Sequence, residues 1–139
     1  MELDILETTT YLFRGDDNYT GGPIGKPLGS LADINTPWEH VRKESSQTSL
    51  FTSFATRRRN AEKFAGNSPI IKVSYNDLNI LQQQGFIKIY GPEEVASLMR
   101  NHPQKRVQRD ANNVQQIMQK NREVLIEGQL PTSVISQSA

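Results

Sequence analysis

The stretch "TSLFTSFATRRRNAEKFAG", Thr48–Gly66, places a strand pattern directly before a helix pattern. Its first part, Thr48–Phe54, is rich in β-branched and aromatic residues, which favour a strand. Thr56 is a suitable N-cap for the helix that follows, and Gly66 is a suitable end for it. Three residues at helical spacing are expected to face the core: Ala61, Phe64 and Ala65.

Further strand and helix patterns lie on both sides of this stretch. We expect strands at Thr8–Gly15, Pro69–Tyr75, Phe86–Gly91 and Arg122–Gly128, and a last edge strand within Gln129–Gln137. We expect helices at Thr36–Ser45, Gly91–Asn101 and Val107–Asn121, and a helical turn at Asn76–Gly85 capped by Asn76 or Asp77. Glycine and proline make Asp16–Ser30 a long loop.

Two of the expected helices carry specific signals. Thr36 is a natural N-cap, Pro37 suits the first helical position, and Glu39 falls where a capping box needs it. The segment Val107–Asn121 has the clearest amphipathic pattern. Its core-facing residues are expected to be Val107, Ala111, Val114 and Met118.

The length and the order of the elements indicate the fold class. The 139 residues are within the usual size of one domain. The sequence shows neither a repeat nor an internal linker, and its strands and helices alternate too irregularly for a doubly wound parallel sheet. We therefore expect a single α+β domain over residues 1–139, with a frayed tail at 136–139.

Composition excludes several classes of site. There is no cysteine, which rules out disulfides, thiolate metal sites and a cysteine nucleophile. The two histidines, His40 and His102, are too few for a typical zinc site, so no metal is expected. No run of about 18 apolar residues occurs, so no membrane-spanning helix is expected, and the acidic start "MELDILETTT" lacks a signal-peptide pattern.

Three short motifs can be weighed and set aside. "GGPIGK" is close to a phosphate-binding loop, but Thr20 replaces its first glycine and Pro27 replaces its magnesium-binding hydroxyl. Arg14-Gly15-Asp16 matches a cell-adhesion tripeptide, yet it closes an apolar strand. A Ser-His-Asp triad has no elbow motif to support it, and His40 is expected to rest on the helix of Trp38.

Three other segments hold candidate functional residues. Arg14 and Gly15 end the first expected strand, Ser53 lies in the second, and Glu123 stands at the head of the apolar run "VLI". A charge at the head of such a strand is costly to bury without a partner and unremarkable on an exposed rim. These side chains therefore become informative only if they meet.

Each candidate also has a plainer interpretation. Glu127 is a rival for Glu123, because it lies on the same strand and, with a period of two, on the same face. The role of Arg14 could be limited to a surface ion pair with Asp16 or Glu2. The serine could be an ordinary strand hydroxyl.

The ordered set of segments resembles the R-S-E class of mono-ADP-ribosyltransferases. In that class, a strand-ending arginine is followed by a Ser-Thr-Ser-like strand with an AxxFA helix, and then by a glutamate pair that leads into a VLI strand. The chain shows "LFRGD", "SLFTSFATRRRNAEKFA" and "NREVLIEGQLP" in that order. The resemblance implies an ADP-ribosyltransferase-like split β-sandwich with flanking helices, and NAD bound in the cleft between two sheets.

The chain departs from this class in two places. Phe54 and Ala55 follow Ser53, so the second and third positions of Ser-Thr-Ser lack hydroxyls. Asn121 stands two residues before Glu123, where the class has Glu or Gln. That position helps to engage the acceptor, and glutamate there accompanies arginine acceptors, so Asn121 argues against protein arginine as the target.

The resemblance assigns a role to each candidate residue. Arg14 would hold the pyrophosphate of NAD with its forked donors. Gly15 would let the backbone approach the nicotinamide amide, because it has no Cβ. Glu123 would stabilise the positive charge that develops on the ribose as nicotinamide leaves. Ser53 would donate a hydrogen bond that keeps Glu123 ionised and oriented, and the chemistry needs no metal.

The resemblance also implies a biological setting. Short members of this kind form the toxic tip of large secreted bacterial proteins, such as Rhs-type and type VI effectors, and act in the cytoplasm of a competing cell. ADP-ribose would pass to an essential protein or RNA there, and the producer would need a cognate immunity protein. The alternatives are an NAD glycohydrolase with the same site and a non-catalytic RNA- or protein-binding module.

Basic residues bear on the choice of acceptor. Arg57, Arg58 and Arg59 are consecutive, so a helix would spread them over its outer surface. The segment Arg100–Arg109 adds further cations and His102. A solvated face is the plain interpretation, and a phosphate-binding patch for RNA or DNA is the alternative. The segment "NNVQQIMQKN", just before Asn121 and Glu123, is expected to border the acceptor.

Overall fold

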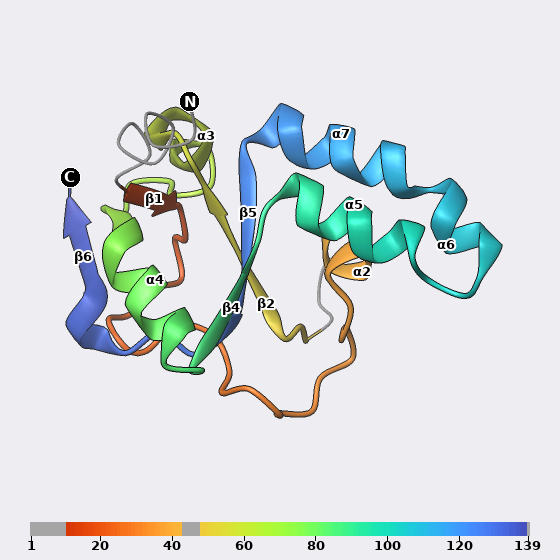
Figure 1. Cartoon of the computed structure of the whole chain (residues 1–139). Helices are drawn as coiled ribbons and strands as arrows, with labels where there is room; N and C mark the ends of the chain where they lie inside the picture. Colours follow the sequence, from red (N-terminus) through yellow and green to blue (C-terminus); the bar gives the residue numbers. More distant parts are fainter. Residues whose placement is uncertain (1–10, 43–47, 139) are drawn as a thin grey trace.

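The computed structural model describes residues 11–42 and 48–138, which combine strands and helices (Figure 1). The strands are β1 (Tyr11–Arg14), β2 (Phe51–Ala55), β3 (Ile70–Ser74), β4 (Ile87–Tyr90), β5 (Glu123–Gly128) and β6 (Ile135–Ser138). The helices are α2 (Pro37–Arg42), α3 (Arg58–Glu62), α4 (Tyr75–Gln83), α5 (Pro92–Arg100), α6 (Lys105–Arg109) and α7 (Ala111–Asn121), with a 3₁₀ turn η1 (Thr132–Val134). The predicted α+β class is confirmed, and residues 8–10 of the first expected strand lie outside the described ranges.

The described strands form one open antiparallel sheet in the order β4-β5-β2-β1-β3-β6. Most neighbouring strands are joined over four or five residue pairs. β1 and β2 are joined by a single pair, Phe13 with Ala55. The sheet therefore consists of two three-stranded halves, β4-β5-β2 and β1-β3-β6, with a narrow joint between them.

Helices cover one face of the half-sheet β4-β5-β2. α5 and α7 run side by side there, and α2 and α6 lie next to them (Figure 1). Phe51 of β2 and Leu125 of β5 face these helices. Because side chains alternate between the two faces along a strand, the odd-numbered residues of β2 and β5 point to this face. The buried residues of this core are Phe51, Val95, Ala96, Met99, Val107, Ala111, Val114, Met118 and Leu125.

A second core lies on the opposite face and includes both half-sheets. α4 packs against β3 and β4 on this side (Figure 1). The buried residues of this second core come from five of the strands and from neighbouring segments: Leu12, Ile24, Phe54, Ile71, Val73, Leu78, Ile87, Ile126 and Leu130. Because apolar burial contributes roughly 25 cal/mol per Å², this shared core and not the single β1–β2 pair holds the halves together.

The helix after β2 differs from its expected form. It spans only five residues, and Arg57 occupies the N-cap position that we expected for Thr56, without a side-chain cap bond. Ala61 and Ala65 are buried as predicted. The prediction for Phe64 was wrong, because its side chain is 61% exposed. The helix ends before Phe64, so the helical spacing that would have turned this ring inward does not apply.

Two other helices also differ in extent. The expected helix over 107–121 is divided into α6 and α7 at Asp110. The four apolar residues predicted to face the core from this segment are all buried, which confirms its amphipathic pattern. α4 is a full helix of nine residues and not a turn, and its cap is Ser74, whose Oγ accepts a hydrogen bond from the backbone N–H of Asp77 at 3.4 Å.

The last described residues belong to the sheet. β6 pairs with β3 in a register that joins Ile71 to Gln137 and Ile70 to Ser138. The expectation of fraying from residue 136 therefore fails for 136–138, and residue 139 lies outside the described ranges. As predicted, this final segment forms an edge strand.

Candidate active site

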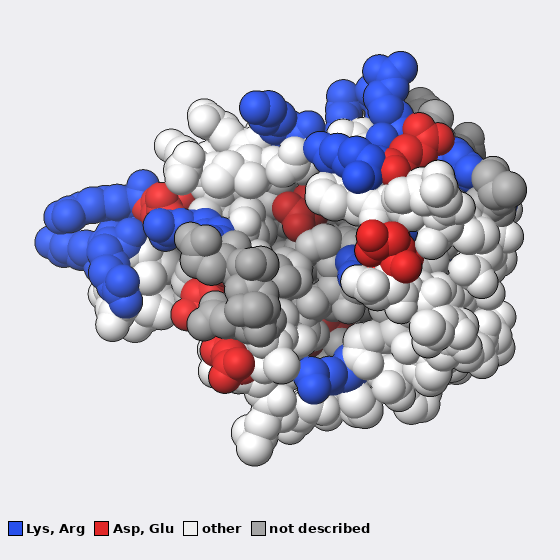
Figure 2. Space-filling model, turned by 180° about the vertical axis from the view of Figure 1, so that it is seen from behind, with Lys and Arg blue, Asp and Glu red and all other residues white. Residues whose placement is uncertain are grey.

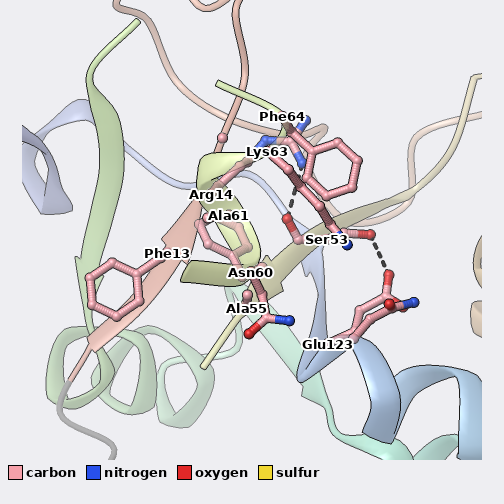
Figure 3. Close-up of a pocket in the computed structure, with 12 residues that line it drawn as sticks. Phe13, Arg14, Ser53, Ala55, Asn60, Ala61, Lys63, Phe64 and Glu123 are labelled. Carbon is pink, nitrogen blue, oxygen red and sulfur yellow. Dashed lines mark hydrogen bonds between the residues drawn. The ribbon is translucent and has the colours of Figure 1, made fainter. Parts of the chain in front are cut away.

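A pocket lies where β1 and β2 separate. Beyond the pair Phe13–Ala55, the same antiparallel register would bring Gly15 opposite Ser53, but the ladder has already ended there. The carbonyl oxygen of Ser53 instead accepts a hydrogen bond from Nη1 of Arg14 at 3.0 Å. The cavity has a volume of about 310 Å³ (Figure 3). A gap in the sheet, bridged by an arginine, thus forms the site.

The pocket contains every site residue expected from the sequence. The lining residues are Phe13, Arg14, Gly15, Ser53, Phe54, Ala55, Asn60, Ala61, Lys63, Phe64, Asn121 and Glu123. They come from β1, β2, α3 with the turn after it, and the α7–β5 junction. Segments far apart in the sequence therefore meet around one cavity.

The central contact joins Ser53 to Glu123. In the β2–β5 register Ala55 is opposite Glu123, and Ser53 is opposite Leu125. Ser53 and Glu123 are therefore diagonal neighbours on one face of the sheet, within reach of each other. The Ser53 hydroxyl donates a hydrogen bond to Oε2 of Glu123 at 2.7 Å (Figure 3). This is the bond that the sequence interpretation required of the serine.

The turn before Glu123 fixes where β5 begins. Arg122 ends α7 in the left-handed conformation, with φ of 54° and ψ of 37°. Among the described residues it is the one non-glycine residue with positive φ. Such a conformation costs roughly 1–2 kcal/mol for an L-residue. Its carbonyl accepts a hydrogen bond from the backbone N–H of Thr56 at 2.9 Å, which ties this turn to the end of β2.

Arg14 contacts two groups at the edge of the pocket. Besides the Ser53 carbonyl, its guanidinium contacts Oδ2 of Asp16 at 3.4 Å. The predicted alternative of pairing with Asp16 is thus present, whereas Glu2 lies outside the described residues. A guanidinium has five N–H donors, so these two contacts leave donor capacity for an anion. Its side chain is 27% exposed, which keeps it reachable from the pocket.

Gly15 is explained by the close approach of α3. A Cβ at this position would lie against the carbonyl oxygen of Ala61 and 2.8 Å from the backbone nitrogen of Ala65. Both obstacles are backbone atoms, so they cannot rotate away. Glycine is therefore needed for α3 to form the wall of the pocket, which is a reason that the sequence did not reveal.

The rival carboxylate lies outside the pocket. Glu127 shares the sheet face of Glu123, as the strand period predicted. Its Oε1 accepts a hydrogen bond from the hydroxyl of Tyr90 on β4 at 2.8 Å. Burial raises the pKa of Tyr90 well above its usual value, and the hydrogen bond to Glu127 and the charge of Glu127 raise it further. Glu127 is therefore engaged with β4 and not with the site.

Sequence reasoning missed His40. Its expected position on the helix of Trp38 is correct, and Thr36 caps that helix as predicted: Thr36 Oγ1 accepts the backbone N–H of Glu39 at 3.4 Å and donates to the Glu39 carboxylate at 2.6 Å. His40 itself is only 7% exposed. Its Nε2 lies 2.7 Å from Ser53 Oγ. No spacing in the sequence shows this contact, because the helix has to fold back onto β2 to make it.

The order of groups differs from that of a hydrolytic triad. In a triad a histidine stands between the serine and the carboxylate. Here the serine stands between His40 and Glu123, and the other ring nitrogen of His40, Nδ1, lies 2.7 Å from Oγ of Ser49. The carboxylate thus contacts the serine, whereas in a triad it contacts Nδ1 of the histidine.

The rim of the pocket is aromatic and basic. Phe64 lines the cavity, and Nζ of Lys63 lies 5.3 Å from the centre of its ring. Asn121, exposed at the end of α7, also lines the cavity. An exposed ring beside a cation can contact a planar group on one side of the opening.

The clustered basic residues noted in the sequence form two separate groups. Arg57 and Arg59 are exposed at α3, and Arg58 pairs with Glu62 at 3.4 Å. Lys105, Arg106 and Arg109 are exposed on α6. Figure 2 shows Lys and Arg gathered at these two ends of one face. A phosphate-binding role for either group stays a prediction.

Comparisons with protein-family models, curated proteins and solved structures found no match. Within residues 11–42 and 48–138, no cluster of three or more metal-ligating His, Asp or Glu side chains occurs. In the same ranges no helix has the length and apolar character needed to cross a membrane. The geometry of the pocket is therefore the basis for assigning a function.

Proposed function

We propose that the protein is an NAD-dependent mono-ADP-ribosyltransferase. The observation that carries this proposal is the meeting of a guanidinium, a hydroxyl and a carboxylate at one cavity. Arg14 and Ser53 are separated by 39 positions, and Ser53 and Glu123 by 70. These are the three groups that the resemblance assigns to NAD binding and cleavage. Their meeting at one cavity, from distant parts of the sequence, supports that assignment.

Each group has a task that its position supports. As the bond between the ribose C1′ and the nicotinamide nitrogen breaks, its electron pair leaves with nicotinamide and positive charge develops on the ribose. Glu123 would stabilise that charge, which is worth roughly 3–4 kcal/mol for a well-placed group in a water-poor site. Ser53 keeps the carboxylate in one orientation through its hydrogen bond. An acceptor nucleophile then bonds to C1′ and loses its proton.

Arg14 would bind the pyrophosphate next to the ribose. Its planar fork matches two phosphate oxygens, which an ammonium group cannot do. The cavity of about 310 Å³ is near the lower end of the ~300–1,000 Å³ typical of small-molecule sites. We therefore assign the cavity to the nicotinamide ribose, with the rest of NAD extending past Arg14 and Gly15.

The sheet supports the finer fold assignment in one respect. A split β-sandwich needs a cleft between two sheet halves, and the halves here are joined by the single pair Phe13–Ala55 next to the pocket. We propose this joint as the NAD cleft. Asn121, which lines the pocket at the end of α7, would contact the acceptor, for which a protein and an RNA are the two candidates. Delivery as a secreted bacterial effector, with an immunity protein in the producer, belongs to the same proposal.

The proposal is tested with NAD labelled on the adenylate moiety and a bacterial lysate. The protein should release nicotinamide and transfer label to a macromolecule, and separate digestion with RNase and protease should show which class carries it. Release of nicotinamide without labelled macromolecule would favour the NAD glycohydrolase. If NAD stays intact, the enzyme assignment fails and a binding module is the better interpretation.

A further inference from the structure

His40 is a deeply buried polar residue that contacts the site. It lies on α2, and 7% of its surface is exposed. Both ring nitrogens are 2.7 Å from serine hydroxyls, Nδ1 from Ser49 and Nε2 from Ser53. Its ring also packs edge-on against Phe51, with 6.1 Å between the ring centres. A histidine held from both sides at the back of a carboxylate site has its orientation fixed.

The protons along this chain of contacts can be counted. A serine hydroxyl has one proton to donate. An ionised Glu123 can only accept, so the Ser53 proton points to Oε2 of Glu123. Ser53 Oγ must then accept from His40, which requires the proton on Nε2. The tautomer of His40 is thereby determined by the carboxylate two contacts away.

The far end of the chain agrees with this assignment. Oγ of Ser49 accepts the backbone N–H of Phe51 at 3.1 Å. The proton of the Ser49 hydroxyl can therefore be donated to Nδ1 of His40, which is the acceptor nitrogen of the Nε2–H tautomer. The direction of donation runs without conflict from the Phe51 backbone to Glu123.

We infer that His40 is a positioning residue for Glu123 and that it acts through Ser53. With Nε2–H donating to its oxygen, the Ser53 hydroxyl has one orientation left, and that orientation points at the carboxylate. The contact at Ser53 replaces the hydroxyls that Phe54 and Ala55 do not supply on this strand. The effect on catalysis rests on the proposed function, whereas the hydrogen-bond chain does not.

The backbone around α2 holds His40 in place. At the start of the helix, Thr36 Oγ1 accepts the backbone N–H of Glu39 and donates to the Glu39 carboxylate. Ile34, just before it, bridges to Ser49: the Ile34 N–H donates to the Thr48 carbonyl at 2.9 Å, and the Leu50 N–H donates to the Ile34 carbonyl at 3.0 Å. The segment that presents His40 is thus fastened to the segment that presents its two serines.

The tautomer provides a test that needs no enzymatic activity. In ¹⁵N NMR spectra of the wild-type protein at neutral pH, His40 should show a protonated Nε2 and an unprotonated Nδ1. In Ser53→Ala the Nε2 signal should shift, because its acceptor is gone, whereas the Nε2 signal of His102 should stay where it was. An Nδ1–H tautomer for His40, or no response to Ser53→Ala, would overturn the hydrogen-bond chain.

The catalytic part is tested with a matched pair of variants. Gln places an amide NH₂ near the position of Nε2 and can still donate to Ser53, whereas Leu cannot. For nicotinamide release, His40→Leu should lower kcat about tenfold with KM for NAD unchanged, and His40→Gln should recover most of the loss. Equal kcat values for the two variants, with both folded, would reject positioning. If the wild-type protein releases no nicotinamide, the proposed function fails and the NMR result still decides the chain.

Discussion

β5 carries a glutamate near each end, and the two ends differ. Both side chains point to the same face of the sheet, four residues apart. Glu123 lines the pocket, where it accepts a hydrogen bond from Ser53. Glu127 accepts one from Tyr90, a neighbour on β4. The same residue type on the same strand is thus placed in a cavity at one end and tied to the sheet at the other.

The difference shows that the neighbouring strands, and not β5 itself, determine the role of each glutamate. Glu123 lies at the edge where β1 separates from β2, so the pocket opens beside it. At the other end, β4 pairs with β5 up to Ile87 and Gly128, and this pairing keeps Glu127 within the sheet. Each prediction below tests one side of this comparison against the other.

The largest effect is expected from removing the charge at one end only. Glu123→Gln should lower kcat for nicotinamide release by about 10²–10³-fold, because one well-placed group in such a site is worth that much. Glu127→Gln should change kcat by less than about threefold. The rate is measured by chromatography of nicotinamide, with the melting temperature as a check on folding. A larger loss in Glu127→Gln than in Glu123→Gln would reverse the assignment.

The next effect concerns the fork of Arg14. Arg14→Lys keeps the charge but loses the two-pronged donor geometry, so the Kd for NAD should rise about tenfold or more. The control is Arg59→Lys at an exposed position of α3, where the Kd for NAD should stay within about twofold. Calorimetry measures both. An unchanged Kd in Arg14→Lys would show that Arg14 does not bind the pyrophosphate of NAD. The pocket beside Glu123 would then lack a phosphate-binding group.

A smaller effect is expected from the wall of the pocket. Gly15→Ala places a Cβ against the backbone of Ala61 and Ala65, so it should lower the free energy of unfolding by about 1–3 kcal/mol. Gly22 is the matched control, because a Cβ there would meet nothing within 4 Å. Its change to Ala should be neutral or slightly stabilising. Urea unfolding measures both, and equal stabilities would show that α3 does not need glycine to approach β1.

The smallest effect is expected at the Glu127 end. Tyr90→Phe removes the hydrogen bond to Glu127 and should cost about 1 kcal/mol or less at pH 8. The folded-state pKa of Tyr90 is raised, so its contribution is complete below the usual value of about 10 and declines as the pH rises above it. The urea midpoint should therefore fall less between pH 8 and pH 11 in Tyr90→Phe than in the wild type. An equal fall in both would show that Tyr90 carries no pH dependence.

Much of the fold could be predicted from local patterns. Each described strand overlaps a segment that the β-branched and aromatic residues had marked, and Thr36 caps its helix through the backbone N–H of Glu39. The shared face of Glu123 and Glu127 follows from the period of a strand alone. Such features depend on neighbours in the sequence, which is why sequence reasoning reaches them.

The features that were missed depend on contacts between distant segments. The exposure of Phe64 follows from the early end of α3, and the contact between His40 and Ser53 needs α2 to fold back onto β2. The narrow joint at Phe13 and Ala55 depends on where β1 stops pairing. None of these leaves a periodic signal, because a period describes one element and not its neighbours.

The most direct test of the central claim is to locate NAD on the protein. NAD is titrated into ¹⁵N-labelled Glu123→Gln protein, in which turnover is slow enough for the complex to be observed, and amide signals are followed by NMR. The account predicts that the signals of Gly15, Ser53 and Asn60 shift with a common Kd, while that of Tyr90 does not. Shifts confined to the Tyr90 end of the sheet, or none at millimolar NAD, would contradict it.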